Sequence, residues 1–179
     1  MIDIIEITNF CKKNKINHNP NYLFKLSFKQ LKALYNYFNL KNHKYKEQND
    51  ISFLIKYQNP NLTKSQEQYE KNTWIMNIKN IYELINKNFL FKPKFTFYFE
   101  YLLSENKRID ILVKNKKKSL IIECSHNYTN ELLKKKENQL NTYLKLYAQN
   151  STSGVVYIND YSSENKTISN TIKALKKLK

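Results

Sequence analysis

The feature that most constrains this chain is a pair of short apolar runs joined by a lysine-rich segment. The runs 109–113 and 120–124 flank the polar stretch 115–118, which is the pattern of two strands and the turn of a hairpin. One acid interrupts each run, Asp110 in the first and Glu123 in the second. An ionised carboxylate among apolar side chains is costly unless it is paired or binds a metal. We therefore expect the two carboxylates to lie side by side on neighbouring strands, although both could instead face solvent on half-exposed strands.

The patterns around this hairpin predict an α/β fold. Residues 74–85 repeat apolar side chains every three or four positions, which indicates an amphipathic helix, and residues 95–103 read as a strand. A helix containing Gln139 follows the hairpin, and then come a strand at 154–160 and a last helix at 167–178. The order helix, three strands, helix, strand, helix predicts a mixed central sheet flanked by helices on both faces. The last two strands should be joined by a right-handed parallel crossover.

The first third of the chain reads as a separate, small helical region. Residues 27–38 begin with a serine that suits an N-cap and carry apolar residues at helical spacing, and a second apolar helix is expected at 50–55. Residues 59–72 are polar and read as a linker or as a solvated helix start. We therefore expect a helical N-terminal region over 1–58 and the α/β domain over 73–179.

The charge of the chain favours a phosphate-rich partner. There are 31 Lys and Arg residues against 15 Asp and Glu residues, which gives a formal net charge of +16. Nearly all the cations are lysines, which suit contact with phosphates better than bidentate reading of bases. The abundance of Lys, Asn, Ile, Tyr and Phe is also typical of a gene in a very A+T-rich genome, such as that of an organelle, a virus or a mobile element. Codon bias is therefore an alternative source of some of the charge.

Several functional classes are excluded by what the sequence lacks. Cys11 and Cys124 make neither a disulfide framework nor a zinc site, and Cys124 is expected to be a core thiol. The three histidines are scattered without ligand spacing. No apolar stretch approaches the roughly 20 residues that span a bilayer, and the first residues lack the basic start of a secretory signal. We expect an intracellular protein in a reducing compartment, with no membrane partner.

The segment from about 95 to 160 resembles the core of the PD-(D/E)XK nuclease superfamily, the restriction-endonuclease-like fold. Asp110 and Glu123 match the two acidic positions of that family's metal site, and Gln139 with Tyr143 matches the Gln-x-x-x-Tyr signature of its RecB-like members. The chain departs from the family at Ser125, which stands where the motif lysine is expected. In some members that lysine lies on the next helix, where this chain has Lys135 and Lys136. A helix face can also simply be basic.

The resemblance implies a set of site residues. Metal ligands would be Asp110, Glu123 and the main-chain carbonyl of Cys124, with Glu83 of the preceding helix as a further ligand or else a solvent-facing charge. Glu100 is a similar supplement. Ser125, Lys135 and Lys136 join the two acids as candidate catalytic residues. Predicted contacts to nucleic acid come from four residues: Gln139, Tyr143, Lys134 and Arg108.

The N-terminal region is similar to a SAP-type helix-extended-helix DNA-binding module. The similarity rests on Leu26, Ser27, the Leu31 and Leu34 pair, and the apolar helix expected at 50–55. The glycine of that module's central turn is missing. The alternative is that these are two helices packed on the nuclease-like core.

Together these features predict a Mg²⁺-dependent or Mn²⁺-dependent nuclease that hydrolyses phosphodiester bonds, with DNA favoured over RNA as substrate. The alternative is a catalytically inactive nucleic-acid-binding protein, such as a structural subunit of a ribonucleoprotein or an organellar ribosome. That alternative follows from Ser125 and the diffuse lysines, and it places the chain in a larger nucleoprotein assembly. A third possibility is a protein-interaction domain, in which codon bias alone would account for the positive net charge.

Overall fold

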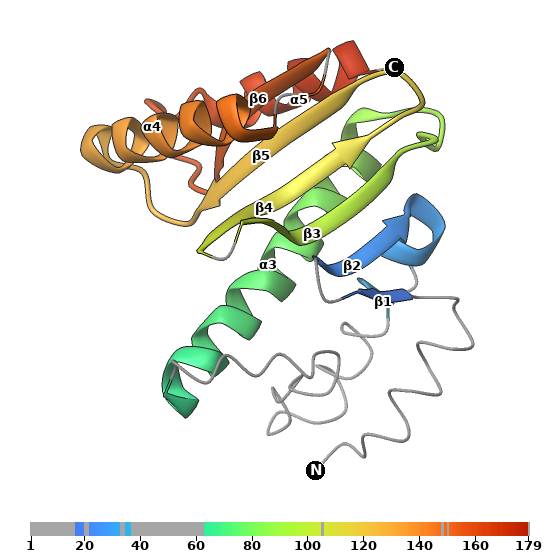
Figure 1. The fold of residues 1–179 in the computed structure, drawn as a ribbon. Helices are drawn as coiled ribbons and strands as arrows, with labels where there is room; N and C mark the ends of the chain where they lie inside the picture. The colour runs from blue at the N-terminus through green and yellow to red at the C-terminus, as the bar shows by residue number, and fades with distance from the viewer. Residues whose placement is uncertain are drawn as a thin grey trace.

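The structure, a computed structural model, describes residues 17–19, 22–32, 35–36, 63–104, 106–147, 149 and 151–178. Its helices and strands form one α/β arrangement (Figure 1). In chain order the elements are β1 (Asn17–Asn19), β2 (Tyr22–Ser27), α3 (Lys64–Asn88), β3 (Thr96–Ser104), β4 (Lys107–Lys114), β5 (Ser119–Ser125), α4 (Asn130–Tyr147), β6 (Thr152–Ile158) and α5 (Thr167–Leu178). The predicted fold class, a mixed sheet flanked by helices, is confirmed.

The six strands lie in the order β1-β2-β3-β4-β5-β6, which is also their order along the chain. Neighbouring strands are antiparallel from β1 to β5, whereas β5 and β6 are parallel. The connection between these parallel strands runs through α4, as the sequence predicted. A parallel pair needs such a crossover because its two strands start at the same end of the sheet.

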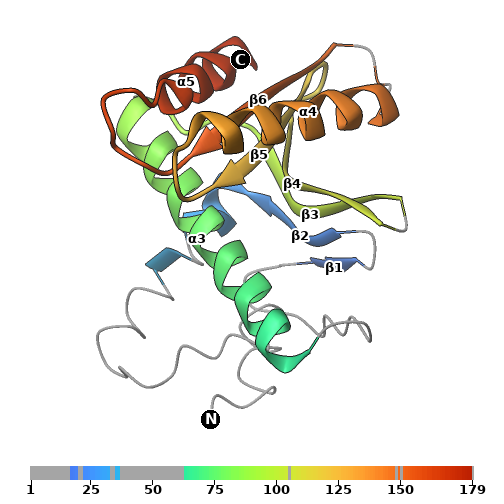
Figure 2. The ribbon, with the colours of Figure 1, turned by 90° about the vertical axis from the view of Figure 1, so that its left-hand side faces the viewer.

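Alternating side chains divide the core between the two faces of the sheet. Ile111, Val113 and Ile122 pack with α3 and α5 on one face. Leu112 and Ile121 pack with α4 on the other face. Figure 2 shows α3 and α4 on different sides of the strands. The central strands are therefore buried on both faces, which explains why β4 and β5 read as nearly continuous apolar runs.

Helix α3 begins well before the position expected from the sequence. Its N-cap is Thr63, whose hydroxyl accepts the backbone N–H of Gln66, while the Gln66 side chain accepts the backbone N–H of Thr63. This reciprocal capping box satisfies N–H groups that a helix start leaves unpaired. Residues 64–72 are thus helical, which corrects the predicted linker in favour of a solvated helix start. Residues 59–62 lie outside the described residues.

The N-terminal region also differs from its prediction. Strands β1 and β2 belong to the main sheet, and β2 pairs with β3 from Phe24 to Ser27. The described part of this region is therefore neither purely helical nor separate from the α/β domain. Ser27 does cap a short helical segment at 28–32, again through a capping box with Gln30. The expected helix at 50–55, and with it most of the SAP-like pattern, lies outside the described residues.

The turn between β4 and β5 fixes the end of the last helix. The side-chain oxygen of Asn115 accepts the backbone N–H groups of Lys117 and Lys118 at 2.8 and 2.7 Å. Its amide nitrogen donates to the carbonyl of Leu178, and the Lys118 ammonium donates to the carbonyl of Lys177 at 2.8 Å. Carbonyls in the last turn of a helix have no partner within the helix. The hairpin turn therefore caps the C-terminal end of α5.

The chain's one glycine, Gly154 of β6, lies against the Leu140 side chain of α4. A Cβ atom at this position would lie 2.6 Å from Cδ1 of Leu140. We predict that Gly154→Ala lowers the free energy of unfolding by about 1–3 kcal/mol, because the buried leucine has to move. Urea denaturation measures this change. The matched control is Ser153→Ala, an exposed neighbour on the same strand, which should change the value by less than about 0.5 kcal/mol.

Adding Leu140→Val to Gly154→Ala tests the cause of that loss. The smaller side chain makes room for the new methyl group, so the two substitutions should cost less together than the sum of their separate effects. Additive losses would show that the contact with Leu140 is not what requires glycine.

Candidate active site

The register of the central hairpin places Asp110 and Glu123 opposite each other. Strands β4 and β5 pair in steps from Lys114 with Ser119 to Ile111 with Ile122. The next step in the same register brings Asp110 opposite Glu123. Opposed residues of an antiparallel pair point to the same face of the sheet. The structure thus brings the two acids together on adjacent strands, as the sequence predicted.

At this point the two carboxylates accept backbone N–H groups of the opposite strand. The Asp110 carboxylate accepts the backbone N–H of Cys124 at 2.7 Å. The Glu123 carboxylate accepts the backbone N–H of Asp110 at 3.3 Å. Each acid therefore bonds to the backbone of the opposite strand, and these bonds hold both side chains in one orientation. Backbone N–H groups are effective partners for a buried carboxylate because they satisfy it without adding volume.

The Lys136 ammonium bridges the two acids. It lies 3.1 Å from Oδ2 of Asp110 and 3.2 Å from Oε2 of Glu123. Its side chain is 18% exposed, that of Asp110 is 22% exposed, and that of Glu123 is completely buried. One half-buried cation thus serves two carboxylates of different accessibility. Asp110 is the member of the pair that a ligand from solvent can reach.

Burial and charge shift the protonation of this cluster. Burial, reinforced by the charge of Asp110, raises the pKa of Glu123 to about 8, although Lys136 and the backbone N–H of Asp110 oppose the shift. Burial alone would lower the pKa of Lys136, but attraction to Asp110 and Glu123 outweighs it, so that the pKa is raised. Lys136 is therefore a permanent cation at neutral pH, while Glu123 keeps its proton until the pH approaches about 8.

Helix α4 owes its position to contacts at its N-terminal end. The Thr129 hydroxyl accepts the backbone N–H of Leu132 at 3.1 Å, which caps the helix. The Asp160 carboxylate accepts the backbone N–H of Tyr128 at 2.9 Å and so ties the preceding loop to the end of β6. These bonds, together with buried Leu140, Tyr143 and Tyr147 on its inner face, orient the helix so that Lys136 reaches the strands.

Gln139 and Tyr143 lie on the same stripe of α4 as Lys136, at helical spacings of three and four. The Gln139 side-chain amide donates to the Tyr143 hydroxyl at 2.9 Å. Burial raises the pKa of Tyr143, the hydrogen bond from Gln139 lowers it, and the negative charges of Glu123 and Asp110 raise it further. The two signature residues are thus bonded to each other, and Tyr143 lies close enough to the carboxylates to sense their charge.

The remaining candidates occupy different surroundings. Lys134 and Lys135 are exposed on α4, so the bridging lysine is Lys136 rather than Lys135. Ser125 is half-buried at the end of β5, and its carbonyl accepts the backbone N–H of Asn159 at 2.9 Å. Arg108 makes an ion pair with Glu100 at 3.7 Å.

Cys124 contributes to the site through its backbone. Its side chain is part of the core on the α3 face, as expected of a core thiol. Burial, with the negative charges of Asp110 and Glu123, raises the pKa of this thiol. It is therefore protonated and unsuited to act as a nucleophile at neutral pH.

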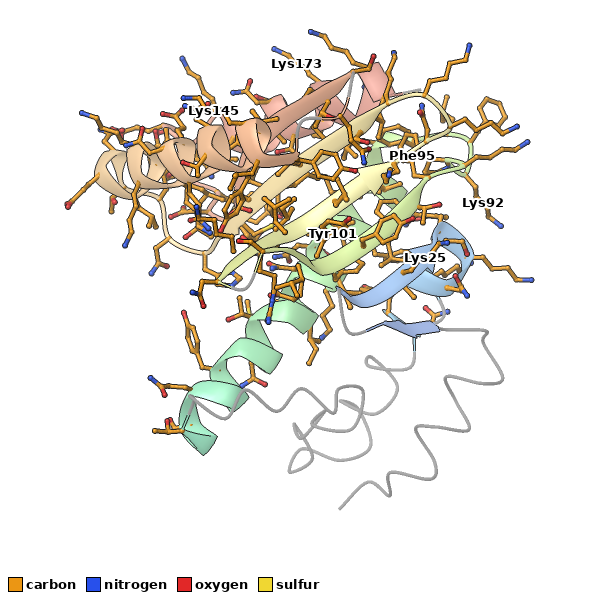
Figure 3. The ribbon with its side chains drawn as sticks, viewed as in Figure 1. Lys25, Lys92, Phe95, Tyr101, Lys145 and Lys173 are labelled. Atoms are coloured by element: carbon orange, nitrogen blue, oxygen red, sulfur yellow. The ribbon has the colours of Figure 1, made fainter. Side chains whose placement is uncertain are left out.

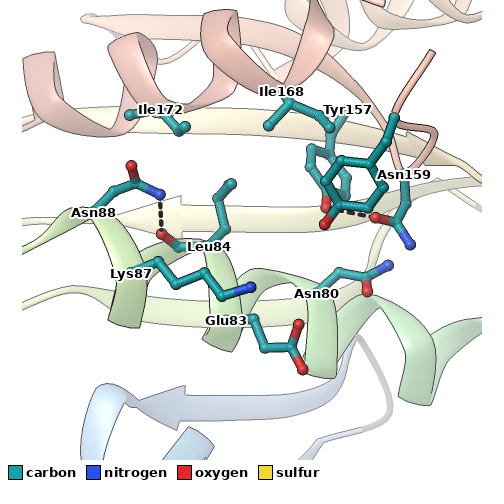
Figure 4. Close-up of a pocket in the computed structure, with 10 residues that line it drawn as sticks. Asn80, Glu83, Leu84, Lys87, Asn88, Tyr157, Asn159, Ile168 and Ile172 are labelled. Carbon is teal, nitrogen blue, oxygen red and sulfur yellow. Dashed lines mark hydrogen bonds between the residues drawn. The ribbon is translucent and has the colours of Figure 1, made fainter.

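Glu83 lies apart from the other predicted metal ligands. It belongs to α3, on the face opposite α4, and its carboxylate accepts the Tyr35 hydroxyl at 3.2 Å. Glu83 lines a pocket with Lys87 of the same helix, Tyr157 of β6, and Ile168 and Ile172 of α5 (Figure 4). The sheet separates this pocket from Asp110 and Glu123. The structure therefore does not bring Glu83 to the carboxylate pair.

The carboxylate pair fits a magnesium ion that completes its shell with water and phosphate. Within the described residues no group of three or more His, Cys, Asp or Glu side chains is arranged to hold a metal. Mg²⁺ is nevertheless commonly bound through one or two carboxylates plus waters and substrate phosphates. Asp110 and Glu123 are such a pair, and the Lys136 ammonium lies between them.

The chain matches no protein-family model, no curated protein and no solved structure in the three comparisons made. In the part of the chain that the structure describes, no helix has the length and apolar character needed to cross a bilayer.

The raised pKa of Glu123 predicts a pH dependence of stability. Between its unfolded value near 4.5 and its folded value of about 8, the native state holds a proton that the unfolded state has lost. This contribution to the free energy of unfolding is complete below the lower value and is lost as pH rises through about 8. We predict that Glu123→Gln, which keeps the shape of the protonated acid, weakens the decline in stability between about pH 5 and pH 8.

Urea denaturation at several pH values measures this slope. Glu137→Gln, an exposed substitution on α4, is the matched control and should leave the slope as it is. An equal slope in the natural protein and Glu123→Gln would contradict the prediction.

Proposed function

We propose that the chain is a metal-dependent nuclease of the PD-(D/E)XK type in which Lys136 takes the role of the motif lysine. The observation that carries the proposal is the cluster of Asp110, Glu123 and Lys136, with the ammonium 3.1 and 3.2 Å from the two carboxylates. Ser125 occupies the motif position without supplying a charge. Lys136 of α4, the helix that follows β5, supplies the charge instead.

Each residue of the cluster has a defined task in this proposal. Asp110 and Glu123 would hold Mg²⁺ or Mn²⁺, which supplies Lewis-acid activation of water and neutralises the scissile phosphate. Lys136 offsets the negative charge that develops on the phosphate and orients the attacking water. The hydrogen-bonded side chains of Gln139 and Tyr143 support the two carboxylates on β4 and β5. Bonding of both carboxylates to backbone N–H groups keeps them in place before substrate arrives.

The charge of the chain supports nucleic acid as the substrate. The formal net charge of +16 attracts a polyanion. Lys134 and Lys135 are exposed on α4 beside the bridging lysine and can contact backbone phosphates. Because lysine contacts carry little base information, we propose cleavage with weak sequence preference, and DNA as the favoured substrate over RNA.

One observation favours a second function, that of a nucleic-acid-binding protein without catalysis. Lys136 already pairs with both acids, and because the pKa of Glu123 is raised to about 8, one ammonium balances the single charge of Asp110 at neutral pH. A structural subunit of a nucleoprotein assembly could keep this cluster as a buried ion-pair network. The two functions differ in whether the protein cleaves nucleic acid and, if it does, whether cleavage requires Lys136 and Asp110.

A cleavage assay with lysine variants tests the catalytic proposal. With Mg²⁺ or Mn²⁺ and single-stranded, duplex and branched substrates, we expect Lys136→Met to lower the rate by about a hundredfold, because a preorganised charge at the phosphate is lost. Lys145→Met, an exposed lysine in the last turn of the same helix, is the control and should retain nearly full activity. Asp110→Asn should abolish cleavage, whereas Ser125→Lys should add little because the cation is already present.

Different outcomes identify the alternatives. Cleavage that survives in Asp110→Asn would assign the activity to a contaminant. No cleavage by any variant, with nucleic-acid binding unchanged in Asp110→Asn, would favour the binding protein.

Salt dependence tests the phosphate contacts separately from catalysis. We predict that the affinity for nucleic acid falls linearly in a log–log plot against salt, by roughly tenfold or more between about 50 and 200 mM. Fluorescence anisotropy with two oligonucleotides of unrelated sequence measures both this slope and the sequence preference. An affinity indifferent to salt would show that the lysines do not contact phosphates and would favour codon bias as their origin.

A further inference from the structure

Helix α4 covers only part of its face of the sheet, and the half-buried rings of Tyr98 and Tyr101 lie at the margin of the covered part. Helix α4 packs mainly on β5 and β6. Figure 1 shows β2 well away from this helix, whereas Tyr147 of α4 reaches the ring of Tyr101 on β3. The face carries Lys25 of β2 with Tyr98 and Tyr101 of β3, and Figure 3 labels two of these residues. We call Lys25, Tyr98 and Tyr101 the tyrosine face.

An unusual backbone conformation sets the two tyrosines on one face. Residues three apart on a regular strand point to opposite sides of a sheet, yet Tyr98 and Tyr101 both pack against the α4 side of the core. Between them Glu100 has a φ of 53°, a left-handed conformation that is uncommon for a residue other than glycine. This residue reverses the alternation of β3. The two rings lie 6.0 Å apart, centroid to centroid, at 84°.

Lysines flank these rings at both ends. The Lys25 ammonium lies 5.9 Å from the centroid of Tyr98. The Lys114 ammonium lies 5.9 Å from the centroid of Tyr147, whose ring contacts Tyr101 at 6.1 Å. The three tyrosine rings thus form a row with one cation at each end. Aromatic rings among cations are the composition of surfaces that stack bases and neutralise phosphates.

The tyrosine face adjoins the carboxylate cluster directly. Tyr98 is opposite Leu112 and Tyr101 is opposite Ile109 in the pairing of β3 with β4. Asp110 lies between these two partners along β4. Leu112 and Asp110 are two residues apart on one strand, a step of about 7 Å. Asp110 therefore lies within about one such step of the residues of β4 that pair with the two tyrosines.

We propose that the tyrosine face binds single-stranded nucleic acid, stacking bases on Tyr98 and Tyr101 and leading the adjoining phosphate to Asp110, Glu123 and Lys136. Delivery of the phosphate to the carboxylates rests on the proposed nuclease function, whereas stacking of the bases on the tyrosines does not. Single strands are favoured over duplexes because a paired base exposes only its edges, and an unpaired base can place its ring against an aromatic side chain. The proposal names the substrate class of the site: unpaired strands, or unpaired ends and branches of a duplex.

The test compares two double variants in binding to a short single-stranded oligonucleotide, a duplex of the same sequence, and a free mononucleotide. Tyr98→Leu with Tyr101→Leu removes the rings but keeps apolar bulk, while Tyr98→Phe with Tyr101→Phe keeps the rings and serves as the matched control. In metal-free buffer containing a chelator, so that no cleavage occurs, we expect the leucine pair to weaken single-strand binding by roughly tenfold per base stacked. The phenylalanine pair should stay within about twofold, because stacking needs the ring and not the hydroxyl. Duplex binding should change little in both pairs.

A second measurement uses the natural protein and does not depend on the fold of a variant. Ultraviolet crosslinking of a single-stranded oligonucleotide containing iodouracil, mapped by mass spectrometry, should label Tyr98 or Tyr101. Crosslinks confined to other residues, or an equal loss of single-strand and duplex affinity in the leucine pair, would overturn the proposal. Loss of single-strand binding in the leucine pair without cleavage by the natural protein would sustain the tyrosine face and refute the nuclease. Cleavage by the natural protein, together with unaltered single-strand binding by the leucine pair, would sustain the nuclease and refute the tyrosine face.

Discussion

The completely buried carboxylate of Glu123 is the constraint on which the rest of the site depends. A charged acid with no access to water is unstable unless its partners are close and well placed. Here the partners come from two elements: the backbone of β4 and the ammonium of Lys136 on α4. The register of the hairpin and the docking of α4 must therefore both be correct for this acid to be tolerated. The packing of the sheet and the chemistry of the site are thus set by the same contacts.

The lysine bridge also separates folding from metal binding. A structural zinc site is unfolded without its ion because the ligands repel each other or remain unsatisfied. In this chain Lys136 lies between the two acids at hydrogen-bonding distance. The acids are therefore partnered in the native structure without a metal ion. In the proposed nuclease, a divalent cation at Asp110 and Glu123 would have to share the carboxylates with the ammonium. Affinity for that cation would then be coupled to movement of the Lys136 side chain, and a bound phosphate that attracts Lys136 would assist cation binding.

The sequence predicted the central elements well because their apolar runs are separated by polar turn residues. It predicted the last helix over 167–178, where the structure has Thr167–Leu178. Strand β1 was missed because its three residues are all polar, and β2 because its last residues, Leu26 and Ser27, fit the SAP-type helical pattern. Residues 64–72 read as a linker or a solvated helix start because the first turns of α3 carry few apolar residues. The threonine and glutamine of the capping box were the available signal. Lys135 and Lys136 could have been told apart, since only Lys136 shares the stripe of Leu140 and Tyr143. That α3 lies on the face opposite α4, which removes Glu83 from the carboxylates, depends on tertiary packing that local patterns do not encode.

The left-handed conformation of Glu100 has a consequence for the local stability of β3. A residue with a side chain loses about 1–2 kcal/mol in this conformation, and the sheet has to sustain that loss in the middle of a strand. The pairing of β3 with β4 is regular before Glu100 and shifts register again between Leu102 and Ser104. The outer half of this strand is therefore held less tightly than the half that starts at Thr96, and its amide protons should exchange with solvent sooner. The part of the sheet nearest the carboxylates is thus also the part that can open without unfolding the core.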